Sequence, residues 1–132
     1  MEAYAVTKRR DPLGEGKEFE VYAWPTVRRN FPLREGWDRY EQPTLPSKLR
    51  PDNILYNDET EEAIIVEMKD RVEITEADVR KVRGYMDEFA GIVKVSRISG
   101  FVPIAWDTDV SPRVRRLARR LGIRFRRLGW RM

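Results

Sequence analysis

Apolar residues in the middle of the chain predict two strands joined by an acidic turn. The first strand starts with Asp52, and the second runs from about Ala63 to Lys69 around three consecutive β-branched residues. Side chains alternate along a strand, so Glu67 and Lys69 leave one face together. If the strands pair around residues 57–62, Asp52 lies alongside Glu67. Two carboxylates and one ammonium group then converge, a pattern that suits a divalent metal and phosphodiester hydrolysis.

Beyond these strands, apolar residues recur at every third or fourth position, which predicts a helix of about fifteen residues. Thr75 and Asp78 resemble a capping box at its start, and Gly91 is expected to end it. Lys81 and Tyr85 are four residues apart and share one face, beside the apolar stripe and outside it. Tyr85 suits either an aromatic residue that flanks the core or a functional group. The stripe itself consists of Val79, Val82, Met86 and Phe89.

The C-terminal part predicts two more strands around a second helix. Residues 100–106 form a buried strand, in which a proline argues for an edge or bulged position. Ser111 as N-cap and Pro112 at the first helical position open the helix, and Gly122 ends it. Residues 123–128 form the last strand. The inward side of the helix is expected to carry Val114, Leu117, Ala118 and Leu121.

The N-terminal third gives weaker patterns. Residues 15–24 fit a short helix stopped by Pro25, and they also fit an alternating strand. Residues 27–37 are interrupted by a proline and a glycine and are predicted to be irregular, with at most one helical turn. A first strand is expected over Asp38–Leu45. Taken together, the elements predict one α/β domain over residues 1–132, with a central mixed sheet flanked by helices.

Composition restricts the available chemistry. The chain has no cysteine, which excludes disulfides, thiolate zinc sites and iron–sulfur clusters. It has no histidine, which excludes Ser-His-Asp and Cys-His catalysis and histidine-ligated zinc. Among phosphodiesterase chemistries, an Asp/Glu/Lys site with Mg²⁺ or Mn²⁺ is one of the few that remain. The sequence has neither a long apolar run nor a signal-peptide pattern, so a soluble, cytoplasmic protein without membrane contact is expected.

Charge is distributed unevenly along the chain. Residues 110–132 contain nine arginines and no acidic residue, and all 22 acidic residues precede them. This basic region fits a footprint for a phosphate backbone, and it fits equally well a solvated helix face in a protein from a thermophile. In the predicted helix, Arg113, Arg116 and Arg120 share one exposed side. These three are the candidate residues for binding nucleic acid.

Pro51-Asp52, followed after fourteen residues by Glu67-Met68-Lys69, resembles the signature of the PD-(D/E)xK nuclease superfamily. The alternative is a surface hairpin in which Glu67 and Lys69 pair only with their neighbours. Residues 50–128 are similar, in the order of their parts, to the nuclease domain of the NucS/EndoMS mismatch-specific endonucleases and their RecB-like relatives. That family usually has a Gln-x-x-x-Tyr pair on the helix after this motif. Here Tyr85 matches the tyrosine, and Lys81 stands in the place of the glutamine. A lysine can contact a phosphate, but it cannot replace the hydrogen bonds of glutamine.

The resemblance implies a restriction-endonuclease-like core and one-step hydrolysis of DNA. Asp52, Glu67 and the backbone carbonyl of Met68 would hold Mg²⁺ or Mn²⁺, and Lys69 would orient or deprotonate the attacking water. Many relatives add a glutamate from the first helix, for which Glu20 is the first choice here and Glu18 the second. The catalytic set implied in this way is Asp52, Glu67, Lys69, Lys81 and Tyr85.

The leading hypothesis is therefore a metal-dependent DNA endonuclease. The alternative is a non-catalytic nucleic-acid-binding protein, or a nuclease-like subunit of a larger assembly. A homodimer is expected, because two copies related by a two-fold axis cut both strands of a duplex most simply. The candidate aromatic residues for its interface are Phe101, Trp106 and Trp130.

Overall fold

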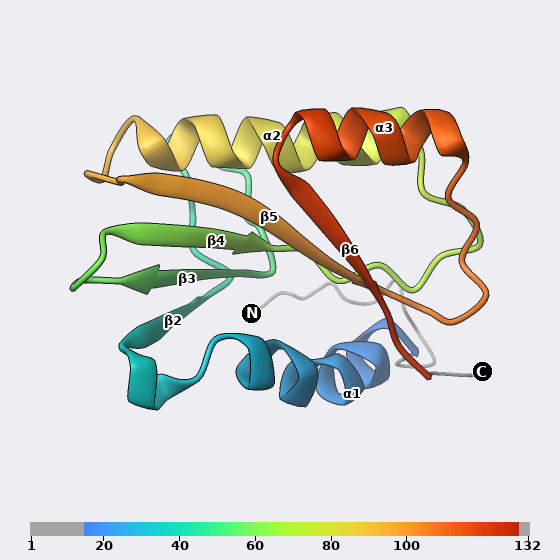
Figure 1. Cartoon of the computed structure of the whole chain (residues 1–132), viewed down its shortest axis with the longest axis horizontal. Helices are drawn as coiled ribbons and strands as arrows, with labels where there is room; N and C mark the ends of the chain where they lie inside the picture. The colour runs from blue at the N-terminus through green and yellow to red at the C-terminus, as the bar shows by residue number, and fades with distance from the viewer. Residues whose placement is uncertain (1–14, 130–132) are drawn as a thin grey trace.

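A five-stranded sheet lies between one helix on one side and two on the other (Figure 1). The computed structural model describes residues 15–129, with side chains from residue 18 onward. Its elements, in chain order, are α1 (Glu15–Asn30), the 3₁₀ turn η1 (Leu33–Glu35), β2 (Trp37–Glu41), β3 (Asn53–Asn57), β4 (Glu62–Val66), α2 (Glu76–Ala90), β5 (Arg97–Ile104), α3 (Pro112–Arg120) and β6 (Ile123–Arg127).

The strand order is β2-β3-β4-β5-β6, with β2, β3 and β4 antiparallel and β4, β5 and β6 parallel. This confirms the predicted mixed sheet in an α/β fold. β3 and β4 pair with Asn53 opposite Val66, so continuing the same register by one residue places Asp52 opposite Glu67. The hairpin turn lies between Asn57 and Glu62, as predicted.

Each face of the sheet has its own apolar core, because neighbouring side chains of a strand point to opposite faces. Ile54 and Ile65 pack under α2 and α3, whereas Leu55 and Val66 pack against α1. Gly100 of β5 lets α2 approach the first of these faces. A Cβ atom at Gly100 would lie 2.9 Å from Cγ1 of Val82 in α2, closer than packed atoms allow.

The prediction of a short N-terminal helix ending at Pro25 was wrong in its length, because α1 continues through Pro25 to Asn30. A proline inside a helix costs about 3 kcal/mol. Burial of a large apolar side chain returns roughly 1.5–3 kcal/mol. α1 and the residue after it bury Phe19, Val27 and Phe31, so tertiary packing outweighs the local cost. Residues 27–30 therefore belong to α1, while η1 is the single helical turn expected in this region.

Two strand predictions also need correction. β2 spans Trp37–Glu41 and does not reach Leu45, which is buried in the loop that follows. β5 contains Pro103 although it lies between β4 and β6, so this strand is not at the edge. Pro103 is tolerated because its backbone polar groups face β4, and β4 has already ended at this point. There its carbonyl accepts a 2.9 Å hydrogen bond from the Lys69 N–H.

The helix boundaries downstream agree with the predictions. Thr75 and Asp78 form a reciprocal capping box at the start of α2, and Gly91 is its C-cap residue. Ser111 caps α3, and Gly122 follows it with a φ of +79°, a conformation that glycine adopts without strain. Within residues 15–129, no helix is long and apolar enough to cross a membrane.

Candidate active site

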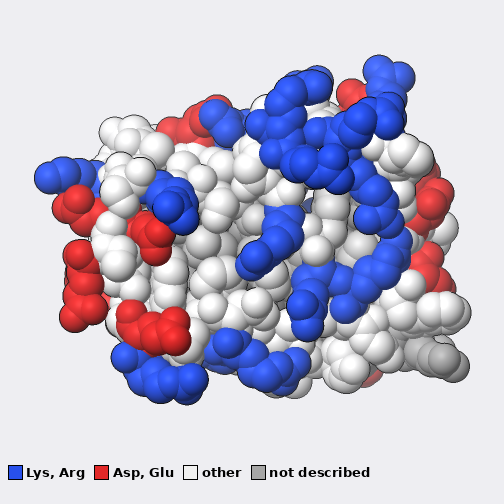
Figure 2. Space-filling view, viewed as in Figure 1, with Lys and Arg blue, Asp and Glu red and all other residues white. Residues whose placement is uncertain are grey.

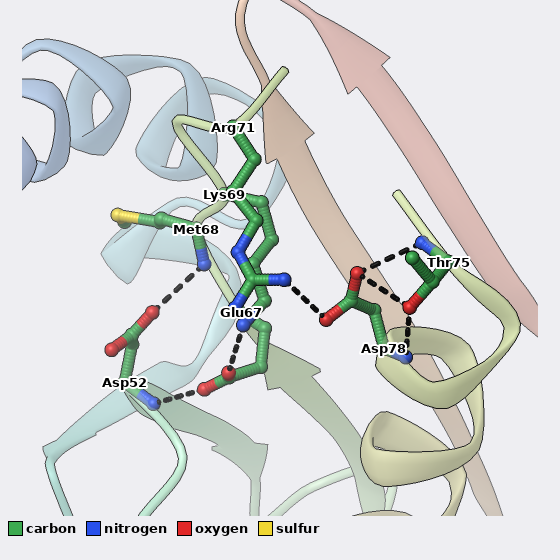
Figure 3. Close-up of polar contacts among 7 residues, drawn as sticks. All are labelled: Asp52, Glu67, Met68, Lys69, Arg71, Thr75 and Asp78. Carbon is green, nitrogen blue, oxygen red and sulfur yellow. Dashed lines mark hydrogen bonds and ion pairs between the residues drawn. The ribbon is translucent and has the colours of Figure 1, made fainter. Parts of the chain in front are cut away.

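The two carboxylates predicted to meet do so at the ends of β3 and β4 (Figure 3). The Asp52 N–H donates a 2.7 Å hydrogen bond to Oε1 of Glu67, and the Met68 N–H donates a 2.8 Å bond to Oδ2 of Asp52. Each side chain is thus fixed by the backbone of the opposite strand. Both side chains leave the sheet on the α2 side, since Asp52 follows the parity of Ile54 and Glu67 that of Ile65.

Lys69 completes this group. Its Nζ lies 3.5 Å from Oε2 of Glu67, and the two side chains are only 13% and 7% exposed. β4 has ended by Lys69, but the bond from its N–H to Pro103 keeps the chain extended. Side chains therefore continue to alternate beyond the end of β4, which places Lys69 on the same side of the sheet as Glu67.

Burial controls the ionisation of the acid pair, by which we mean Asp52 and Glu67. Loss of hydration raises the pKa of both carboxyls. For Glu67, burial and the neighbouring charge of Asp52 together raise the pKa to about 7, while Lys69 and Lys81 act in the opposite direction. Near neutral pH the pair therefore tends to retain one proton, and a bound cation would release it.

Lys81 and Tyr85 of α2 both interact electrostatically with the acid pair. The positive charge of Lys81 lowers the pKa of Asp52 and Glu67. The pKa of the Tyr85 phenol is raised, mainly by burial and then by the charges of Glu67 and Asp52. Tyr85 is only 2% exposed and belongs to the core under α2. Its predicted position outside the apolar stripe was therefore wrong, although its phenol lies near the acids.

Residues that could hold a metal ion are the acid pair and the backbone carbonyl of Met68. These are hard oxygen donors, which suit Mg²⁺ or Mn²⁺, and two carboxylates of raised pKa are a chemically reasonable start of such a site. In the part of the chain that the structure describes, no group of three or more acidic, histidine or cysteine side chains is close enough to share a metal. Glu20 and Glu18 therefore do not join the acid pair. They belong to α1, which packs on the opposite face of the sheet.

Arginines of α3 and β6 form a second charged region along the β6 edge of the sheet (Figure 2). Arg113 binds Glu76 through a 2.6 Å ion pair, and Arg127 donates to the carbonyls of residues 105, 106 and 108. Arg115 donates a 3.2 Å hydrogen bond to the carbonyl of Val110. Among residues 18–129, the remaining exposed arginines here have no acidic or carbonyl partner. They are Arg116, Arg119, Arg120, Arg124 and Arg126, which we call the arginine surface.

Arg71 was not among the predicted site residues, but Figure 3 shows its side chain beside that of Lys69. Its Nη1 donates a 2.9 Å bond to Oδ1 of Asp78, the capping residue of α2. No signal in the sequence placed Arg71 here, because the chain bends at Arg71 and Val72, where the alternation of side chains along a strand no longer applies.

Two solved structures have a similar architecture. A repair endonuclease from Pyrococcus abyssi matches with a TM-score of 0.57 and 14% identity, over 82% of this chain and 46% of that one. A complex of EndoMS with double-stranded DNA matches with a TM-score of 0.63 and 17% identity, over 96% of this chain and 47% of that one. The chain has the restriction-endonuclease-like fold of these proteins. It spans about half the length of each. No protein-family model and no curated protein sequence matches it.

Proposed function

We propose that this chain is a metal-dependent endonuclease that hydrolyses phosphodiester bonds of DNA. The observation that supports it most is the meeting of Asp52, Glu67 and Lys69 on one side of the sheet, with each acid held by a backbone N–H. Two convergent carboxylates disfavour the folded state when no metal ion is bound, because like charges repel, and this favours a metal-binding role over a purely structural one. The shared fold with two endonuclease structures is consistent with this function.

In the proposed reaction, the acid pair and the Met68 carbonyl would hold Mg²⁺ or Mn²⁺. The ion would supply Lewis acidity toward the scissile phosphate and would lower the pKa of a water molecule. Lys69 orients the attacking water and offsets the negative charge that develops on the phosphate oxygens. Lys81 adds a second cation from α2, and the Tyr85 hydroxyl supplies a hydrogen-bond donor beside the acids.

The arginine surface is proposed to bind the phosphate backbone. Five guanidinium groups without acidic partners in the described part of the chain form a dense positive field, which attracts a polyanion without reading its sequence. The alternative function, nucleic-acid binding without catalysis, would need only this surface. Convergent acids would weaken such binding, which favours the catalytic proposal.

The function is tested by incubating labelled duplex, branched and single-stranded DNAs with the protein in Mg²⁺, Mn²⁺ or EDTA. Cleavage of at least one DNA with a metal, and no cleavage in EDTA, is expected. DNA binding without cleavage under every condition would instead support the non-catalytic alternative. Asp52→Asn is the matched control, because the amide retains an oxygen for the Met68 N–H and loses the charge that a metal requires.

Two copies of the chain are proposed to act together, since one site cuts one strand of a duplex. Phe101 is excluded as an interface residue, because it is 2% exposed and lies in the core beneath α1. Trp106 is 48% exposed and remains a candidate, while Trp130 lies outside the described residues. Light scattering at micromolar concentration is expected to give twice the chain mass of 15.7 kDa. A mass equal to one chain would contradict the dimer.

A further inference from the structure

Arg71 extends from the loop that follows the acid pair. Its backbone carbonyl accepts a 2.6 Å hydrogen bond from the hydroxyl of Thr108. The rest of the loop is fixed by the 2.8 Å bond from the Asp109 N–H to the Val72 carbonyl and by the 2.9 Å bond from the Ile74 N–H to the Asp109 carbonyl. The Cα of Arg71 therefore has a defined position beside the candidate site.

The guanidinium group of Arg71 has a single anchoring partner in the described part of the chain. Nη1 bonds to Asp78, whose own side chain is 11% exposed and whose other oxygen accepts from the N–H and the hydroxyl of Thr75. Asp78 is thus held by two hydrogen bonds from Thr75 and serves as an anchor for the guanidinium group. A guanidinium has five N–H donors in one plane. Of the three guanidinium nitrogens of Arg71, only Nη1 has a partner among the described residues.

The Arg71 side chain is nevertheless 51% exposed. In the view of Figure 3 it points back along the chain past Lys69, and its guanidinium group is directed at Asp78. An exposed guanidinium with free donors, preorganised by a buried carboxylate, is suited to two parallel hydrogen bonds with a phosphate.

We propose that Arg71 binds a backbone phosphate of the DNA next to the scissile phosphodiester. This inference rests on the proposed nuclease function. Lys69 would act at the reacting phosphate, and Arg71 would hold the neighbouring one, so that the substrate is oriented on both sides of the bond to be cut. A solely structural Arg71 would instead anchor its loop to α2 through Asp78 and would not contact DNA.

Arg71→Gln separates these roles, because glutamine keeps a polar side chain in the loop but carries no charge. The variant is expected to lower kcat/KM on a cleaved labelled DNA by about 10- to 100-fold. In EDTA, the slope of log affinity against log salt concentration is expected to become shallower by about 0.9, the contribution of one phosphate contact. Arg71→Lys restores the slope and only part of kcat/KM, because a lysine is a point charge without the planar fork.

Asp78→Asn is the control for the structural role. It weakens the anchor but keeps the Arg71 cation, so it is expected to lower the melting temperature while leaving the salt slope of binding unchanged. The proposal is overturned if Arg71→Gln binds with the wild-type slope, or if both variants lose the same activity and stability with no change of slope. The salt titration in EDTA does not require cleavage, so failure of the wild type to cut any DNA would count against the nuclease function and leave this test in force.

Discussion

The acid pair and the arginine surface carry opposite charges and are built in opposite ways. Glu67 is buried and Asp52 is half-buried, and each accepts a backbone hydrogen bond from the neighbouring strand. The arginine surface consists of exposed side chains, none of which has an acidic partner in the described part of the chain. Fixed geometry suits a site whose chemistry depends on tenths of an ångström, whereas mobile exposed cations suit a polyanion that binds through net charge. Substitutions should therefore act abruptly in the first region and gradually in the second.

The largest effect is expected at the acid pair and Lys69. Asp52→Ala, Glu67→Ala and Lys69→Ala should each lower single-turnover cleavage by about a thousandfold or more, because metal binding and charge stabilisation are lost together. Thermal unfolding checks that each variant remains folded. The isosteric variants Asp52→Asn and Glu67→Gln should be equally inactive. Retained cleavage in a folded variant of either acid would refute the metal-site assignment.

At the arginine surface, a graded effect on binding is expected. Arg116→Ala combined with Arg120→Ala should make the slope of log affinity against log salt shallower by about two, because each phosphate contact contributes about −0.9. All DNA sequences should weaken alike. Fluorescence anisotropy over a series of salt concentrations measures both quantities.

A matched control removes two arginines that already have acidic partners. Arg97 lies 3.5 Å from Glu62, and Arg113 lies 2.6 Å from Glu76. Arg97→Ala combined with Arg113→Ala changes the net charge by the same amount as the first double variant, yet it should change the slope less. Equal slopes for the two double variants would mean that only net charge matters and that the arginine surface has no special role.

The smallest effect concerns the stability of the metal-free protein and its dependence on pH. Folding raises the pKa of Glu67 from 4.5 to about 7. Between these values the folded protein binds a proton that the unfolded chain has released, so the free energy of unfolding decreases as the pH rises and levels off above about 7. Glu67→Gln removes this penalty and should stabilise the protein at pH 8 by about 1–3 kcal/mol.

Chemical denaturation at pH 5 and pH 8, with and without Mg²⁺, measures this difference. The advantage of Glu67→Gln should be present in EDTA at pH 8, and it should shrink at pH 5, where Glu67 is largely protonated. Saturating Mg²⁺ should stabilise the wild type and have no such effect on the variant. If the advantage of Glu67→Gln over the wild type in EDTA were smaller at pH 8 than at pH 5, the raised pKa of Glu67 would be contradicted.

The sequence by itself determined the elements whose signals are local. The capping box of Thr75 and Asp78, the N-cap Ser111 and the glycine after α3 fix the helix ends through hydrogen bonds to residues three or four positions away. The acid pair could also be predicted, because strand alternation and a short hairpin turn set the register between Asp52 and Glu67 without reference to the rest of the fold.

Only the tertiary structure decided features that depend on contacts between distant segments. α1 passes through Pro25 because the sheet buries its apolar side, and Pro103 fits inside the sheet because β4 ends before it. Tyr85 belongs to the core because β-strands far away in the sequence cover it. The place of Arg71 depends on Thr108 and Asp78, which lie 37 and 7 residues away. Local propensities contain no information on such partners, because these partners become neighbours only when the layers pack.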